Sequence, residues 1–236
     1  MSRSEIDRAG VTLTSYVNAS GDPGPTWDEF SHAVDVMIKF RKTFQTPMNK
    51  TAMGLRSMVM SCCPEIRELG GNVPVVQRLK RSEQILLKLN RFPNSKLSNM
   101  GDIGGVRAVL SDRAQVDRVA ERIAVKWETL GRTRDTRDVP APTGYRALHI
   151  IVLRDGRRIE VQLRTPDEHE WAVAVERTGQ RLGFRLKEGM GPPDLKEYFR
   201  LASHGMYADS QGIVPDQAFR DAWEEIHRTT AHYFRR

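Results

Sequence analysis

The sequence predicts an α/β (α+β) fold, in which a mixed β-sheet is packed by helices. Two strand-like segments, RALHIIVL and RRIEVQLRT, are joined by Asp155-Gly156, a dipeptide typical of two-residue hairpin turns. A third strand-like segment, GGVRAVL, is separated from them by a stretch with helical periodicity from Ala114 to about Leu130. Most of the remaining chain also follows a helical period, so helices are expected to cover the sheet.

Helices are expected before the strands. Residues 18 to 26, NASGDPGPT, have the composition of a turn-rich linker. Thr26 and Glu29 then have the spacing of a capping box, which predicts the start of a helix running to about Phe44. A second helix is expected from about Pro47.

The rest of the chain is assigned in the same way. Residues 75 to 91 are interpreted as a helix with four apolar residues inward: Val76, Leu79, Leu86 and Leu89. Residues 131 to 144 form a basic loop that contains proline. A helix is expected to begin at Pro166, and two more near 194 to 206 and 216 to 234. The central order is therefore helix, strand, helix, strand, strand.

Composition and charge narrow the class of protein. Of 236 residues, 39% are hydrophobic and 28% charged, which is typical of a soluble globular protein. No apolar run approaches the roughly 18 residues of a membrane span, and the N-terminus lacks the apolar core of a secretory signal, so a cytoplasmic protein without membrane contact is expected. The net charge of +7 favours polyanionic ligands.

One predicted strand carries a row of polar residues. The period of two in RRIEVQLRT gives two faces, Ile159, Val161 and Leu163 against Glu160, Gln162 and Arg164. The polar row is either the solvated surface of an antiparallel sheet or the floor of an active site. Asp102 begins the strand DIGGVRAVL and would lie near Glu160 if the two strands are neighbours. Two carboxylates among many cations suit Mg²⁺ and a phosphoryl or pyrophosphoryl transfer.

Other nucleotide and hydrolase motifs are missing. The sequence has no G-x-x-x-x-G-K-[ST] loop, no dinucleotide fingerprint, no zinc-ligand spacing and no G-x-S-x-G elbow. The two cysteines, Cys62 and Cys63, are adjacent and are expected to be reduced.

Four segments, RLKRSEQILLKL, DIGGVRAVL, TGYRALHIIV and IEVQLRTPDEHEWAVAVE, resemble in order the synthetase domain of the RelA/SpoT family of alarmone synthetases. The resemblance covers roughly residues 75 to 190 and implies a nucleotidyltransferase-like pyrophosphokinase core. Residues 1 to 74 and 191 to 236 would then be helical N-terminal and C-terminal extensions. In this family a pyrophosphate group passes from ATP to the 3′-hydroxyl of an acceptor nucleotide.

The resemblance also implies roles for individual residues. Asp102 would bind Mg²⁺, while Glu160 would help to hold the metal and activate the attacking hydroxyl. Four cationic residues match those that grip ATP, namely Arg78, Lys80, Lys88 and Arg107.

The acceptor side is implied in the same way. Tyr145 matches the tyrosine that stacks on the acceptor base. Three further residues would lie near it: His149, Gln162 and Arg164. Two structural alternatives stay open, in which Tyr145 is a loop aromatic covering the sheet edge and His149 is a hydrogen-bonded strand residue without a catalytic role.

The sequence departs from the guanine-nucleotide synthetases before Tyr145. Those proteins carry a P-K-x-N/S-G-Y run, whereas RDVPAPTGYR lacks the lysine. HEWAVAVE and LGFRLK are more similar to a toxic branch of small alarmone synthetase relatives, whose members modify the 3′ end of tRNA and are neutralised by an antitoxin. The tRNA 3′ end is therefore the favoured acceptor, with GDP or GTP as the alternative and a protein antitoxin as a possible partner.

Other functions are weighed beside this one. The hydrolase half and the regulatory domains of long family members are absent from the sequence, so a small member with synthetase activity alone is expected. An inactive RNA-binding or regulatory module would consume no ATP. An ordinary nucleotidyltransferase would release pyrophosphate rather than AMP.

Overall fold

The computed structural model describes residues 1–18, 24–68, 71, 73–131 and 133–235. Most of the predicted linker at 18 to 26 therefore lies outside the described residues. The chain divides into two compact units. Unit 1 consists of residues 1–108, 118–132 and 150–162, and unit 2 of residues 109–117, 133–149 and 163–236.

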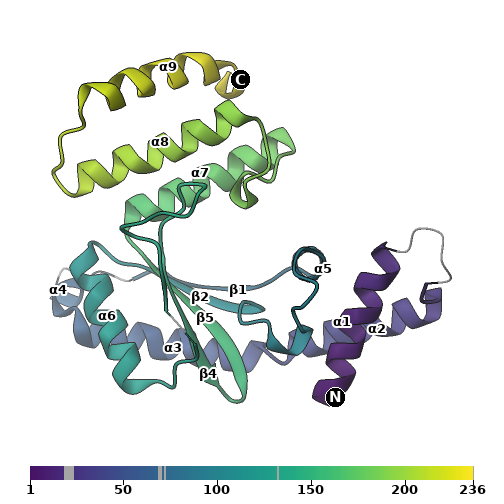
Figure 1. Ribbon diagram of the computed structural model, residues 1–236. Coiled ribbons are helices and arrows are strands. Elements are labelled where there is room, and N and C mark those ends of the chain that lie inside the picture. Colours follow the sequence, from purple (N-terminus) through teal and green to yellow (C-terminus); the bar gives the residue numbers. More distant parts are fainter. Residues whose placement is uncertain (19–23, 69–70, 72, 132, 236) are drawn as a thin grey trace. The chain divides into compact units, whose positions relative to one another are not determined.

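The described part of the chain is a mixture of helices and strands, as Figure 1 shows. In chain order the elements are α1 (Arg3–Asn18), α2 (Trp27–Lys42), α3 (Gln45–Cys62), α4 (Pro64–Glu68), β1 (Val75–Leu79), α5 (Ser82–Arg91), the 3₁₀ helix η1 (Leu97–Asn99), β2 (Gly104–Val109), α6 (Arg113–Lys126), β3 (Arg134–Asp135), β4 (Leu148–Arg154), β5 (Arg157–Arg164), α7 (Pro166–Leu182), the 3₁₀ helix η2 (Leu186–Glu188), α8 (Pro193–Ser210) and α9 (Gln217–Phe234).

The strands form a five-stranded sheet in the order β1-β2-β5-β4-β3. β1 runs antiparallel to β2, and β3 antiparallel to β4. A Cβ atom on Gly105 would lie 3.8 Å from the Glu160 carbonyl oxygen, and farther along the chain the Leu110 amide donates to the Arg164 carbonyl at 2.8 Å. Both contacts advance in the same direction, so β2 and β5 run parallel. The mixed sheet and its helices confirm the predicted fold class.

The structure corrects one predicted helix. Residues 75–79 form strand β1, and only Ser82–Arg91 are helical. Val75 pairs with Ala108 and Leu79 with Gly104 at the two ends of a continuous antiparallel register. Two consecutive valines favour an extended chain, and pairing with β2 satisfies their backbone groups. The central order therefore begins with an additional strand.

The β4–β5 hairpin is confirmed. Asp155 and Gly156 have φ values of 49° and 71°, as a type I′ turn requires. The helix predicted to reach Leu130 ends earlier, at Lys126, because the next residues hydrogen-bond to β4 instead. The Leu130 amide donates to the Ile151 carbonyl at 2.8 Å. The predicted loop 131–144 also contains the short strand β3.

Unit 1 buries the apolar face of its strands against Phe44, which lies between α2 and α3. Ile159 and Val161 of β5 are fully buried, as the period of two predicts. A Cβ atom on Gly104 would lie 3.0 Å from the Ile159 side chain and 3.2 Å from the Phe44 ring, so Phe44 packs on this face. The capping box of Thr26 and Glu29 is present at the start of α2.

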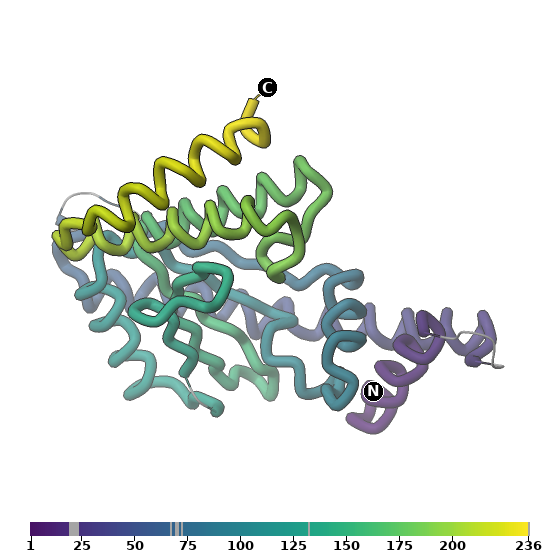
Figure 2. Tube along the Cα trace, turned by 45° about the horizontal axis from the view of Figure 1, so that its top comes forward, coloured from purple at the N-terminus to yellow at the C-terminus, as the bar shows by residue number. Residues whose placement is uncertain are grey.

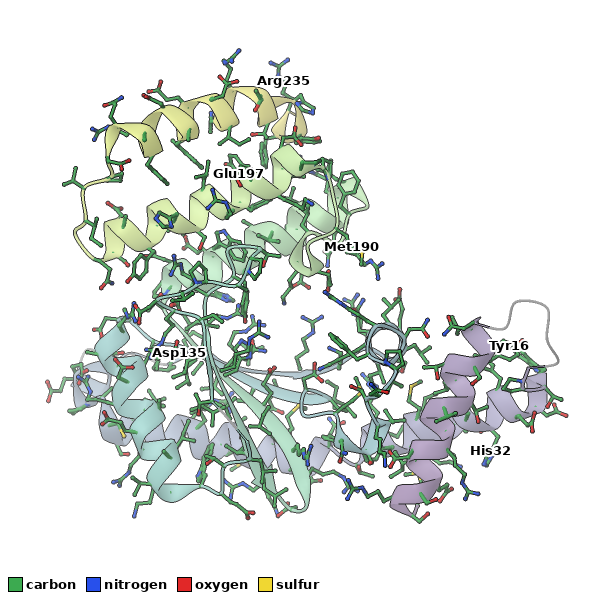
Figure 3. The ribbon with its side chains drawn as sticks, viewed as in Figure 1. Tyr16, His32, Asp135, Met190, Glu197 and Arg235 are labelled. Carbon is green, nitrogen blue, oxygen red and sulfur yellow. The ribbon has the colours of Figure 1, made fainter. Side chains whose placement is uncertain are left out.

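The first helix, α1, is not predicted from the sequence and packs along α2. Tyr16 near its end stacks on Phe30 of α2 at a centroid distance of 4.1 Å, and Figure 3 shows Tyr16 at this position. Among the described residues no helix is long and apolar enough to cross a membrane.

Unit 2 is built around helices α7, α8 and α9. Thr165 and Glu168 form a capping box at the start of α7, and Gly183 ends this helix with a φ of 74°. Trp171 of α7 packs edge-to-face against Phe199 of α8. α9 lies beside α8 in both views (Figures 1 and 2). The helices near 194 to 206 and 216 to 234 are therefore confirmed.

Candidate active site

Unit 1 brings the predicted carboxylate Asp102 together with two predicted lysines. Lys80 directly follows β1, and its amide donates to the Ile103 carbonyl at 2.8 Å, which places it beside Asp102. Lys88 lies on α5, one helical turn before its end. The Nζ atoms of Lys80 and Lys88 lie 2.9 and 2.7 Å from Oδ2 of Asp102. Arg41 supports this segment by donating from Nε to the Lys80 carbonyl at 2.7 Å.

The surroundings of Asp102 keep it ionised. Burial acts to raise the pKa of its carboxyl, but the charges and hydrogen bonds of Lys88 and Lys80 outweigh burial, so the pKa lies below its usual value. The second oxygen, Oδ1, is buried and has no hydrogen-bond partner among the described residues. A carboxylate oxygen in this position is an available ligand for a cation.

A second group of predicted residues lies on one face of the sheet in unit 1. Arg107 donates from Nε to Gln162 Oε1 at 3.4 Å, and Gln162 donates from Nε2 to Glu160 Oε2 at 2.6 Å. Arg78 of β1 is paired with Gly105 of β2. Gly105 carries no side chain between Arg78 and Glu160, which leaves this part of the face open.

The residues of unit 1 fit a Mg²⁺ site. Among the described residues no group of three or more His, Cys, Asp or Glu side chains comes together. Mg²⁺ usually takes one or two carboxylates and completes its octahedron with water and substrate phosphate oxygens. Asp102 provides the orphaned buried oxygen, and Glu160 provides a second carboxylate on a strand next to β2.

Unit 2 brings together three predicted acceptor residues, because Arg164 and His149 both contact the hydroxyl of the third, Tyr145. Arg164 donates to this hydroxyl from Nη2 at 2.5 Å, and His149 Nε2 lies 2.8 Å from it. The Arg164 guanidinium lies 5.0 Å from the Tyr145 ring centroid, and Lys187 lies 5.9 Å from it. Lys187 is a neighbour of Tyr145 that sequence reasoning missed, although LGFRLK contains it.

Burial distinguishes these residues from a solvated surface. Arg164 is 1% exposed, so the polar row of β5 does not end in solvent. Tyr145 is 8% exposed and belongs to a core cluster with Trp171 and Phe199. His149 has the hydrogen bond expected of a strand histidine held in place. Of the ten predicted site residues, seven lie in unit 1, and Tyr145, His149 and Arg164 lie in unit 2.

Comparisons with known proteins find a similarity to the RelA/SpoT family in the central part of this chain. Residues 77–178 match the family model described as "Region found in RelA / SpoT proteins". An uncharacterized protein of Mycobacterium tuberculosis is 29% identical over 126 residues, which are 51% of this chain and 45% of that protein. A guanosine-3′,5′-bis(diphosphate) 3′-pyrophosphohydrolase of Aquifex aeolicus is 29% identical over 136 residues, 57% of this chain and 19% of the enzyme. The chain thus spans less than half the length of these relatives.

Solved structures share the fold. The small alarmone synthetase 1 of Bacillus subtilis, bound to its product pppGpp, has a TM-score of 0.59 at 19% identity, over 74% of this chain and 94% of its own. A GTP pyrophosphokinase family protein of Streptococcus pneumoniae has a TM-score of 0.56 at 18% identity, over 81% of this chain and 96% of its own. Residues 77–178 therefore match the RelA/SpoT region, and the chain shares the fold of small alarmone synthetases.

Proposed function

We propose that this chain is an ATP-dependent pyrophosphokinase that transfers the β,γ-pyrophosphate of ATP to a ribose 3′-hydroxyl. One observation carries the proposal: within the residues that match the RelA/SpoT region, Asp102 is held by two lysines and keeps a buried oxygen for a cation. Arg107, Gln162 and Glu160 form the neighbouring hydrogen-bonded row. Cations for phosphate and carboxylates for a metal are the groups that this transfer needs.

In this mechanism one bond to the β-phosphorus forms while another breaks, and the site residues bind ATP and move the proton. The acceptor 3′-oxygen attacks the β-phosphorus, the bond from the β-phosphorus to the α,β-bridging oxygen breaks, and AMP leaves with the electron pair. Glu160 takes the proton of the attacking hydroxyl, and Gln162 orients Glu160 through their 2.6 Å hydrogen bond. Arg78, Lys80, Lys88 and Arg107 bind ATP phosphates and adenine. When bound to Asp102 and Glu160, Mg²⁺ would neutralise phosphate charge.

A guanine nucleotide is the acceptor that we propose. The net charge of +7 would suit a polyanionic acceptor such as RNA, but the charge is unevenly divided between the units. Unit 1 has 22 Lys and Arg against 14 Asp and Glu, while unit 2 has 15 against 16. The surplus therefore lies with the proposed ATP residues, and unit 2, which holds Tyr145, has no excess of cations to attract an RNA backbone. GDP or GTP needs no such excess.

The 3′ end of tRNA is the second candidate, with a toxin role and a protein antitoxin. The absence of the synthetase lysine from RDVPAPTGYR favours it, because that lysine belongs to the guanine-nucleotide pattern. For the organisation of the chain, we retain a catalytic core at 75 to 190 flanked by helical extensions at 1 to 74 and 191 to 236. The family match at 77–178 falls within this core.

The test is a transfer assay with ATP labelled at the γ-phosphate, Mg²⁺ and the full chain. GDP, GTP and deacylated tRNA are supplied in separate reactions, and AMP is measured in each. Label on GDP or GTP, with an equal amount of AMP, supports the proposal. Label on tRNA supports the second candidate. The Glu160→Gln variant is the matched control for contaminating kinases, and no AMP with any acceptor would contradict pyrophosphate transfer.

A further inference from the structure

Unit 2 contains a cavity of about 400 Å³ that none of the ten predicted site residues lines. Its walls are the first turns of α6 and α7, the second half of α8 and the loop before β4. Six lining residues matter for its chemistry: Arg113, Arg146, Glu168, Trp171, Met206 and Tyr207. The volume lies in the range of small-molecule sites.

Arg146 is a buried cation at this cavity, with 4% of its surface exposed. Its Nε donates to Ser203 Oγ at 3.1 Å, and its Nη1 donates to the carbonyl oxygens of Arg137 and Asp138. All three acceptors are neutral. Within the described ranges no acceptor is bonded to Nη2, and no carboxylate lies at ion-pair distance from the guanidinium. Burial lowers the pKa of Arg146, which reflects the cost of holding this charge away from water.

A second cation and an aromatic ring complete this wall. The guanidinium of Arg146 lies 4.1 Å from the Tyr207 ring centroid, and that of Arg113 lies 5.8 Å from it. Arg113 pairs with Asp138 at 2.8 Å, and the Tyr207 hydroxyl donates to the same carboxylate at 3.0 Å. Asp138 is thus already occupied. Burial raises the pKa of Glu168, and its Oε2 accepts from the Thr165 amide at 3.0 Å in the helix cap.

We propose that this cavity binds a small organic anion, whose phosphate or carboxylate group pairs with Arg146 and Arg113. Its apolar body packs against Trp171, Met206 and Tyr207. The free amino group of Arg146 and the outer edge of Arg113 supply charge-assisted hydrogen bonds, which are stronger than those between neutral groups. The anion gives the buried guanidinium a partner at ion-pair distance, in addition to the attraction of the Glu168 and Asp138 carboxylates.

The site is connected to the loop that carries Tyr145. Arg146 holds the carbonyls of residues 137 and 138, and Ser203 donates from Oγ to the Gly144 carbonyl. An anion that fixes Arg146 therefore also fixes the backbone on the N-terminal side of Tyr145. A ligand here regulates the loop from a cavity that none of the proposed catalytic or ATP-binding residues lines.

The test is calorimetric titration of the full chain with phenyl phosphate, with benzoate and with the neutral benzyl alcohol. Substituting Arg146 itself would release three hydrogen bonds of the loop, so two other variants locate binding. Arg113→Gln removes one cation, and Met206→Trp fills the cavity. Arg228→Gln is the matched control, because Arg228 lies on α9 in the same unit and, within the described part of the chain, pairs with Glu225 alone.

The proposal expects phenyl phosphate or benzoate to bind saturably, with one anion bound per chain. Whichever anion binds identifies the acid group. Arg113→Gln should raise the dissociation constant about tenfold, as loss of a hydrogen bond to a charged group does. Met206→Trp should abolish binding, and Arg228→Gln should leave it unchanged. Equal binding of benzyl alcohol, equal weakening by Arg228→Gln, or no binding of either anion would overturn the proposal.

Discussion

The ion pair between Asp102 and Lys88 should be measurable by a double-mutant cycle. The variants are Asp102→Asn, Lys88→Met and the two combined, and the readout is the free energy of unfolding in urea. Lys88 Nζ lies 2.7 Å from Asp102 Oδ2, and the two side chains are 34% and 20% exposed. The pair is therefore neither fully solvated nor fully buried.

The expected coupling follows from that geometry. Exposed ion pairs contribute about 0.2–1 kcal/mol, whereas hydrogen bonds to charged groups contribute about 1.5–3 kcal/mol. Burial of Asp102 works against its charge, and Lys80 remains as a second partner when Lys88 is removed. We expect a coupling free energy of about 1.5 kcal/mol near neutral pH, between these two classes.

The pH dependence has a definite sign. Because the folded-state pKa of Asp102 lies below its usual value of 3.8, ionised Asp102 stabilises the fold at any pH above 3.8. This stabilisation is lost as the pH falls through the lower, folded-state pKa. The coupling should therefore be constant from neutral pH down to about pH 5 and should shrink below 3.8.

The matched control is Lys96→Met, which removes an exposed lysine of the same unit. Its coupling with Asp102→Asn should be close to zero. A coupling for Lys88 no larger than that for Lys96, or one that grows on acidification, would refute the ion pair and with it the description of Asp102 as a carboxylate held by lysines.

Three further substitutions test the site and its scaffold. Glu160→Gln keeps the size of the side chain, so its melting temperature should be unchanged while AMP formation falls by about 10² to 10⁴; near-normal turnover would exclude Glu160 as the base. Tyr145→Phe keeps the buried ring but removes the hydroxyl bonded to Arg164, so KM for the acceptor should rise about tenfold with KM for ATP unchanged; equal changes in both would contradict an acceptor role. Gly144→Ala adds a Cβ atom at a φ of 89°, 3.1 Å from the Ser203 Cβ, and should lower the free energy of unfolding by about 1–3 kcal/mol; an unchanged urea midpoint would show that the loop adapts.

The strands differ in how clearly the sequence encodes them. β5 alternates Ile159, Val161 and Leu163 with polar residues over its whole length, and no helical period fits this pattern. In β1, Val76 and Leu79 have helical spacing, and the strand has only one buried residue, Val75. Its conformation depends on pairing with β2, which is distant in the chain. Local periodicity therefore predicts β5 and fails for β1.

The candidate site also combines features that local sequence predicts with contacts that depend on segments distant in the chain. Residue types and spacing suggest Asp102, Glu160 and the cations, because carboxylates and lysines in this order suit a metal and phosphates. The attachment of both Lys80 and Lys88 to one oxygen of Asp102 depends on how α5 lies against the segment that precedes β2. No pattern in TGYRALH indicates that Arg146 is buried and donates to three neutral acceptors.

Burial also decides which substitution is informative at Tyr145. An alanine there would remove a ring from the cluster with Trp171 and Phe199, which typically costs about 3–5 kcal/mol for a buried aromatic. Loss of acceptor use in that variant would then report loss of folding in unit 2. Phenylalanine keeps the packing and removes only the hydroxyl between Arg164 and His149. The role of this tyrosine is therefore tested through its oxygen, because its ring serves the core as well.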